Sequence, residues 1–292
     1  MFFFWILTAA AVPLAITPGL LFHFDIAPKI ILLAIAAAVG LARIRSFPGE
    51  ITGLWARREG RWLILLAAAQ VVWFAVTALT STRPWFSMYG SGWRRLGLVE
   101  VAGILVIAVL AAARLVARPA SARTVLRMAV IAGFAASFYG ICEYFGFDPL
   151  QPVAAYQAHA GNSVIVRPPG TMGHADYFGW WLAIEFFCAI ALSRIENGVR
   201  KYLASHAAAT ILSAIVLTGT RAAILAVVCG FAGIIAIQPS RFRLRARTIG
   251  IAGATCFFFA AFYLSPAGTL LRARVVWSGD EPLGGARPLL WR

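Results

Sequence analysis

Residues 62–80 read Trp62-Leu-Ile-Leu-Leu-Ala-Ala-Ala-Gln-Val-Val-Trp-Phe-Ala-Val-Thr-Ala-Leu-Thr80 and contain no charged side chain. A membrane-spanning helix requires about 20 consecutive, largely apolar residues to cross the hydrocarbon core of a bilayer. The run meets this requirement in both length and polarity. It therefore predicts a transmembrane helix.

The composition shows that runs of this kind fill most of the chain. Apolar residues make up 61% and charged residues 13%, and the mean hydropathy is +0.81. A soluble globular chain has about 45–50% apolar and about 25% charged residues. We predict an all-α fold, a polytopic transmembrane helical bundle that forms one integral membrane domain over residues 1–292. Its about nine spans fall near residues 2–18, 28–42, 62–80, 96–114, 125–145, 175–193, 202–218, 221–238 and 249–264.

The 26 basic residues indicate the orientation of these spans. They lie in the gaps between apolar runs rather than on one amphipathic face, which excludes nucleic acid from the predicted partners. Cytoplasmic loops of membrane proteins are enriched in Lys and Arg. This rule predicts an amino terminus inside and a carboxyl terminus outside, with residues 265–292 as the start of an external loop. The basic residues that it places inside are Arg43, Arg45, Arg57, Arg58, Arg61, Arg114, Arg118, Arg123, Arg127, Arg194, Arg200, Lys201, Arg241, Arg243, Arg245 and Arg247.

The remaining basic residues fall outside, where the same rule predicts depletion. Lys29 opens a span and is typical of an interfacial side chain that snorkels to the headgroups. Arg94 and Arg95 follow Trp93 and are typical of an interfacial anchor, with contact to an anion as the alternative. The full outside set is Lys29, Arg83, Arg94, Arg95, Arg167, Arg221, Arg272, Arg274, Arg287 and Arg292.

A short polar turn, Thr218-Gly-Thr-Arg221, separates two of the predicted spans. Arg221 begins the second of these spans, where its charge adds to the positive end of the helix and to the free backbone N–H groups. The planar guanidinium can also bind two phosphate oxygens at once. The turn therefore predicts an anion site, with snorkelling of Arg221 to headgroups as the alternative.

A second polar motif, Arg167-Pro-Pro-Gly-Thr-Met-Gly-His174, precedes the predicted span at 175–193. The prolines make the segment stiff and extended, which would hold Arg167 in place. Gly170 and Gly173 permit close backbone approach, and Thr171 can cap the following helix or donate to a phosphate. The motif fits an anion-binding loop, and an ordinary turn is the alternative.

The acidic and histidine side chains are scattered. His174 and Asp176 are candidates for acid–base chemistry, and helix capping is the favoured interpretation. Glu185 lies near the middle of a span, so we expect it to face the bundle interior, and Glu100 can pair with an outer arginine. The spacing of His, Cys and acidic residues predicts no metal site and no cofactor.

Taken in order, these motifs resemble a known family. Arg-Pro-x-Gly-Thr-x-Gly lies in an outer loop, Thr-Gly-Thr-Arg-Ala-Ala follows two spans later, and Ala-Arg-Pro-Leu-Leu-Trp-Arg ends an outer segment. The ordered set resembles the O-antigen ligase and polymerase superfamily of bacterial envelope glycosyltransferases. The resemblance is best over residues 156–292, while the earlier spans agree in hydropathy alone.

The resemblance implies a metal-independent enzyme of the bacterial inner membrane. Its donor partner would be a glycan linked to undecaprenyl pyrophosphate, and its acceptor a glycan or lipid A-core. Carried over by motif, the residues that bind the donor pyrophosphate would be Arg167, Thr220, Arg221 and Arg287. Arg94, Arg95, Thr171 and His174 are weaker candidates. Membrane lipids would be further partners.

The resemblance leaves the catalytic residue unassigned. The family's proposed acceptor-activating histidine would follow Arg292, so we expect this chain to be an incomplete form of the enzyme. A polymerase of the same superfamily is one alternative function, since ligase and polymerase differ in their acceptor. A transporter for a lipid-linked glycan is another alternative. This function predicts polar residues at mid-membrane depth and an internal repeat.

Overall fold

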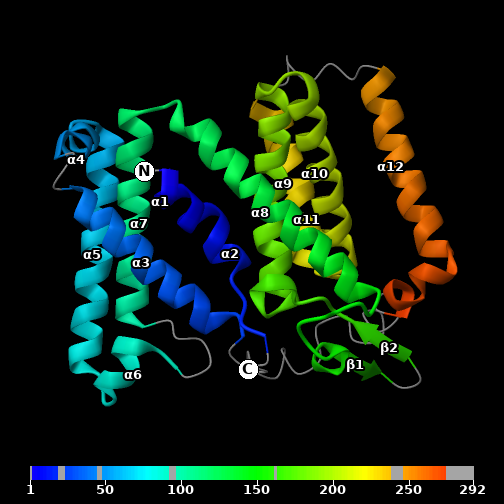
Figure 1. Cartoon of the computed structure of the whole chain (residues 1–292), viewed down its shortest axis with the longest axis horizontal. Coiled ribbons are helices and arrows are strands. Elements are labelled where there is room, and N and C mark those ends of the chain that lie inside the picture. Colours follow the sequence, from blue (N-terminus) through cyan, green and yellow to red (C-terminus); the bar gives the residue numbers. More distant parts are fainter. Residues whose placement is uncertain are drawn as a thin grey trace. The chain divides into compact units, whose positions relative to one another are not determined.

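The computed structural model describes residues 2–18, 24–44, 48–91, 97–160, 163–237 and 246–273 (Figure 1). Helices dominate, as predicted. The longer ones are α3 (Ile26–Ile44), α5 (Arg58–Thr80), α7 (Leu98–Ala117), α8 (Ser121–Tyr144), α9 (Ala175–Ile195), α10 (Gly198–Leu217), α11 (Arg221–Ile237) and α12 (Ala246–Leu264). The shorter ones are α1 (Phe2–Ile6), a π-helical turn (Leu7–Ala11), α2 (Val12–Leu14), α4 (Pro48–Trp55), α6 (Pro84–Tyr89) and 3₁₀ turns at Val153–Ala155, Gly170–Met172 and Pro266–Gly268.

One element departs from the all-helical prediction. Strands β1 (Gln157–Ala160) and β2 (Ser163–Val166) form an antiparallel hairpin in which Gln157 pairs with Val166 and Ala160 with Ser163. Strand β2 ends directly before Arg167, whose backbone N–H donates to the Tyr156 carbonyl at 3.3 Å. The hairpin and this hydrogen bond therefore hold the start of the Arg-Pro-Pro-Gly motif in position.

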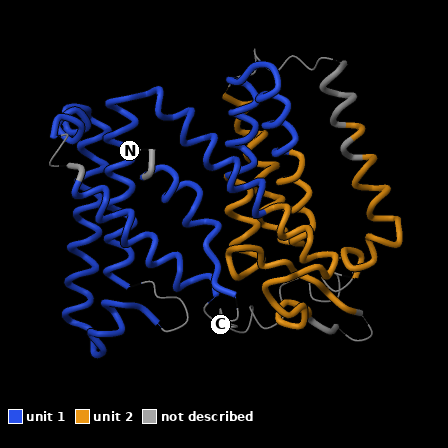
Figure 2. The backbone as a smooth tube through the Cα atoms, viewed as in Figure 1, with its two compact units in different colours: residues 1–136, 185–208 blue, residues 137–184, 209–292 orange. Residues whose placement is uncertain are grey.

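The chain divides into two compact units (Figure 2). Unit 1 comprises Met1–Ala136 and Glu185–Ala208, and unit 2 comprises Ser137–Ile184 and Ala209–Arg292. Helices α8, α9 and α10 each contribute residues to both units. The single membrane domain over residues 1–292 stays a prediction.

In unit 1, helices α3, α4 and α5 all pack against α7. Helix α4 lies within a segment that the sequence predicted as an inner loop. Its Glu50 forms an ion pair with Arg114 on α7, and the Arg114 side chain is buried. A buried ion pair needs its partner close by, so this contact accounts for the position of α4 against α7.

Unit 2 contains the hairpin, the first half of α9, the second half of α10, α11 and α12. Its core includes the fully buried side chains of Phe178, Leu182, Ile211 and Ile215. Phe178 and Leu182 are four residues apart on α9, and Ile211 and Ile215 are four apart on α10. Each pair therefore lies on one face of its helix.

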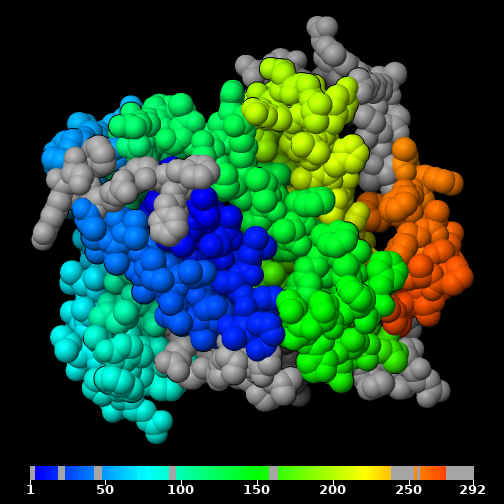
Figure 3. All heavy atoms as spheres, in the orientation of Figure 1, coloured from blue at the N-terminus to red at the C-terminus, as the bar shows by residue number. Residues whose placement is uncertain are grey.

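Four of the described helices, α5, α7, α8 and α9, are long and apolar enough to cross a membrane. Many large apolar side chains of unit 1 are exposed, among them Ile31 on α3 and Trp73 on α5, and Figure 3 shows α3 at the surface. Such exposure suits contact with lipid rather than with water. The helical bundle is confirmed and the four apolar helices support the membrane class, whereas the count of nine spans and their sidedness remain predictions.

Candidate functional site

The Thr-Gly-Thr-Arg turn is ordered by its own threonines. The Thr218 hydroxyl donates to the Ile215 carbonyl at 2.7 Å and accepts from the Thr220 backbone N–H at 3.2 Å. Gly219 has a φ of 63°, the left-handed region that favours glycine. Both threonines are buried. The turn therefore ends α10 and starts α11 at Arg221 in a fixed geometry.

The structure brings the two polar motifs together through Asp176 in the first turn of α9. The Thr220 hydroxyl lies 3.2 Å from the Ala175 carbonyl oxygen and 3.2 Å from Asp176 Oδ1, either of which can accept its proton. Arg167 Nη2 forms an ion pair with the same Oδ1. One carboxylate oxygen thus joins the Arg-Pro-Pro-Gly motif to the Thr-Gly-Thr-Arg motif.

A buried glutamate holds the loop that follows Arg167. The Gly170 N–H donates to Glu143 Oε2 at 2.8 Å, and Glu143, on α8, is fully buried. Gly170 has a φ of 54°, and a Cβ there would lie 2.6 Å from the ring of Phe178. The close backbone approach expected at Gly170 is therefore present. The other carboxylate oxygen of Glu143 has no hydrogen-bond partner among the described residues.

A second acidic side chain, Asp148, lies in the connection between α8 and the hairpin. Its Oδ1 accepts from the Tyr139 hydroxyl at 2.9 Å and from the backbone N–H groups of Leu150 and Gln151. Burial raises the pKa of the Tyr156 phenol, and the neighbouring carboxylates of Asp148 and Glu143 raise it further. Tyr156 therefore stays protonated at physiological pH.

The weaker candidates of the first motif have structural positions. His174 is exposed, and its Nδ1 accepts from the Asp176 backbone N–H at 3.1 Å, so it caps α9. This hydrogen bond needs the lone pair of Nδ1, which places the proton of a neutral ring on Nε2. Helix capping was the favoured interpretation. Thr171 is buried within the loop.

The outside basic residues differ in what they contact. Lys29 donates to the carbonyl groups of Ala15 and Asp25. Arg272 donates to the carbonyl groups of Tyr263 and Ser265 at the end of α12, as a cation at a helix carboxyl end is expected to do. It also donates to the Thr269 hydroxyl. Arg221 is exposed and makes no hydrogen bond or ion pair within the described part of the chain. Its guanidinium is therefore available to a ligand.

The electrostatics of this cluster favour an anion. The contact between Thr220 and Ala175 brings the amino ends of α9 and α11 together, and each such end carries a positive charge equivalent to about half an elementary charge. Asp176 neutralises Arg167, while Arg221 carries its full charge. The cluster can hold a phosphate or pyrophosphate group at Arg221.

No family model matches the chain, and no curated protein and no solved structure is significantly similar to it. The resemblance to the O-antigen ligase and polymerase superfamily therefore rests on the motifs themselves.

Three of the predicted site residues, Arg94, Arg95 and Arg287, lie outside the described residues.

Two acidic side chains that the sequence analysis singled out, Glu185 and Glu100, were not predicted as site residues. Glu185 is buried in α9, as expected, and its Oε2 makes no hydrogen bond to the described part of the chain. Glu100 accepts from the backbone N–H of Gly97 at 3.2 Å and so caps α7.

Sequence reasoning missed Glu143 and Asp148 as parts of the site. The available signal was the spacing of Tyr139 and Glu143, which are four residues apart and therefore share one face of α8 near its end. Acidic residues are rare in this chain, with 11 Asp and Glu in total, so two of them close to the end of one span was a usable indication.

Proposed function

We propose that the protein is a membrane glycosyltransferase of the O-antigen ligase type, which transfers a glycan from an undecaprenyl-pyrophosphate carrier to an acceptor such as lipid A-core. The observation that carries this proposal is the meeting of the Arg-Pro-Pro-Gly and Thr-Gly-Thr-Arg motifs at Asp176, beside Arg221, which has no partner among the described residues. The family resemblance supplies the chemical class of the donor.

In this proposal Arg221 binds the pyrophosphate of the carrier. A hydroxyl oxygen of the acceptor attacks the anomeric carbon of the donor sugar, and the bond between that carbon and the pyrophosphate oxygen breaks. The hydroxyl proton leaves to a base, and the carrier departs with the bonding electrons as a pyrophosphate anion. Arg221 and the amino end of α11 stabilise the negative charge that develops on this leaving group.

Arg167, Thr220 and Asp176 then have positioning roles. The carboxylate of Asp176 fixes the Arg167 guanidinium, and the Thr220 hydroxyl holds the start of α11 against the start of α9. Arg167 presents the remaining N–H groups of its two Nη atoms to the second phosphate of the carrier. Such preorganised donors lower the barrier because they need not reorient during the reaction.

The proposed membrane arrangement follows from the charge distribution of the loops. The chain crosses the bacterial inner membrane about nine times, with its amino terminus in the cytoplasm. The hairpin, the two polar motifs and residues 265–292 lie on the outer face, where lipid-linked glycans are joined to their acceptors in this family.

The test is substitution of Arg221 in bacterial membranes that contain the lipid-linked donor and the acceptor. We expect Arg221→Ala to abolish glycan transfer, measured by electrophoresis of the glycosylated acceptor, and to leave the protein level unchanged. Arg221→Lys should also reduce transfer strongly, because an ammonium group cannot form the bidentate contact.

Arg83→Ala is the matched control. Arg83 is also exposed and also belongs to the outside set, but it lies in the connection before α6. Its replacement should leave transfer unchanged. Normal transfer by Arg221→Ala would overturn the pyrophosphate role, and equal loss in both variants would point to a general effect of outside charge.

A further inference from the structure

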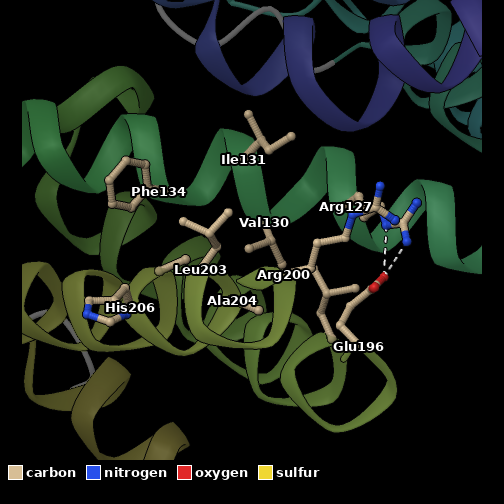
Figure 4. A pocket seen from close by; sticks show the side chains of 11 residues that line it. Arg127, Val130, Ile131, Phe134, Glu196, Arg200, Leu203, Ala204 and His206 are labelled. Carbon is tan, nitrogen blue, oxygen red and sulfur yellow. Dashed lines mark hydrogen bonds and ion pairs between the residues drawn. The ribbon is translucent and has the colours of Figure 1, made fainter. Parts of the chain in front are cut away.

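A basic pocket of about 460 Å³ lies within unit 1 (Figure 4). It is formed by the first half of α8, the end of α9 and the first half of α10. Its charged side chains gather at one end, where Arg127, Arg200 and Glu196 lie close together, and Phe134 and His206 lie at the other end. We call this feature the basic pocket.

The charged end of the basic pocket carries an excess of positive charge. Arg127 donates through Nε and Nη2 to Glu196 Oε1 at 2.8 and 2.6 Å, and Arg123 Nε lies 4.0 Å from the same oxygen. Arg200 is exposed and makes no hydrogen bond or ion pair to any residue in the described ranges. Two guanidinium groups thus share one carboxylate, and the Arg200 guanidinium adds a further positive charge close by.

The remainder of the basic pocket is apolar. Val130, Ile131 and Phe134 line it from α8, and Leu203 and Ala204 line it from α10. Ile131 is 57% exposed and Leu203 63% exposed, so they border an open furrow rather than a closed core. From Arg127 to Phe134 the furrow follows α8 for about 10 Å, at about 1.5 Å of rise per residue.

The predicted spans place the two ends of the basic pocket at different membrane depths. The charged end coincides with the start of α8 at Ser121, the end of α9 at Ile195 and the start of α10 at Gly198. Helices α8 and α9 are both long and apolar enough to span a bilayer, so we expect their ends to lie at the interface and the furrow to extend toward the hydrocarbon.

We propose that the basic pocket binds an anionic membrane phospholipid. Arg200 and Arg127 hold the lipid phosphate, and one acyl chain lies in the furrow between α8 and α10. Basic pockets between membrane helices are suited to anionic headgroups, and a guanidinium group matches the geometry of phosphate oxygens. A zwitterionic lipid would bring a cationic headgroup to the three arginines and is disfavoured. This site is separate from the proposed glycosyl transfer and does not depend on it.

The experiment measures lipid binding to the purified chain of residues 1–292 in detergent, by native mass spectrometry and by thermal unfolding. Phosphatidylglycerol should bind and raise Tm more than phosphatidylcholine with the same acyl chains. Arg200→Gln should weaken phosphatidylglycerol binding about fivefold, the contribution expected of one arginine near an anionic headgroup.

Two further variants make the test specific. Arg194→Gln is the matched control, because Arg194 is an exposed arginine in the last turn of α9 that does not line the pocket, and binding should be unchanged. Ile131→Trp should fill the furrow and weaken binding without removing a charge. Equal binding of the two lipids would overturn the proposal. Equal stabilisation by inorganic phosphate alone would overturn it too, since it would show a free-anion site.

Discussion

At the scale of single residues, the site depends on a carboxylate inside the protein. Glu143 accepts the backbone N–H of Gly170, and no other acceptor contacts that N–H in the described structure. An unpaired backbone N–H that is buried costs about 1–3 kcal/mol. Glu143 therefore stabilises the conformation of the loop between Arg167 and α9.

This contact predicts different outcomes for two substitutions of Glu143. Glu143→Ala removes the acceptor and leaves a cavity, and should lower the free energy of unfolding by about 2–3 kcal/mol. Glu143→Gln keeps a carbonyl oxygen at the same place and should lower it by about 1 kcal/mol or less. Unfolding of the purified protein in mixed micelles measures both. Equal losses would show that Gly170 does not depend on this oxygen.

At the scale of elements, two glycines share one backbone conformation but differ in the space around them. Substituting each therefore distinguishes the cost of backbone strain from the cost of steric overlap. Gly170 precedes α9 with a φ of 54°, and Gly198 begins α10 with a φ of 56°. A Cβ at Gly170 would overlap the Phe178 ring, whereas a Cβ at Gly198 would meet nothing within 4 Å.

Gly170→Ala should therefore destabilise the protein more than Gly198→Ala. Both variants place a Cβ in the left-handed region, which costs about 1–2 kcal/mol. Gly170→Ala adds overlap with a buried ring, at about 1–3 kcal/mol. The difference in unfolding free energy between the two variants measures the overlap alone. A difference of zero would mean that Phe178 moves aside without cost.

The elements also show which features the sequence can predict. Residues 62–80 lie within α5 because apolar length is a local property. The two polar motifs were also recognised locally, because glycine, proline and arginine act on their own segments. The pairing of Glu143 with Gly170 joins residues 27 apart, and Glu50 with Arg114 joins residues 64 apart. Such contacts depend on the packing of helices, which no local pattern specifies, and the hairpin was missed because its strands are short.

At the scale of the whole molecule, the long helices restrict the topology. Between Thr82, after α5, and Asn197, after α9, the described residues contain three helices that are long and apolar enough to cross a membrane: α7, α8 and α9. Helix α6 has six residues and is too short to cross. If all three cross, the odd number of crossings predicts that Thr82 and Asn197 lie on opposite sides. The excess of arginine around Asn197 then predicts that this side is the cytoplasm.

Cysteine labelling tests this arrangement. Thr82 and Asn197 are both exposed, so Thr82→Cys and Asn197→Cys should leave the fold intact. In intact cells, a membrane-impermeant maleimide should label Thr82→Cys. Asn197→Cys should react only after the cells have been permeabilised. The natural chain, whose cysteines lie within apolar runs, is the background control. Labelling of both variants in intact cells would exclude an odd number of crossings. Labelling of Asn197→Cys and not of Thr82→Cys in intact cells would show that the topology is inverted. With the predicted span at 202–218, the Arg221 site would then lie in the cytoplasm, away from the acceptors that the proposed reaction requires.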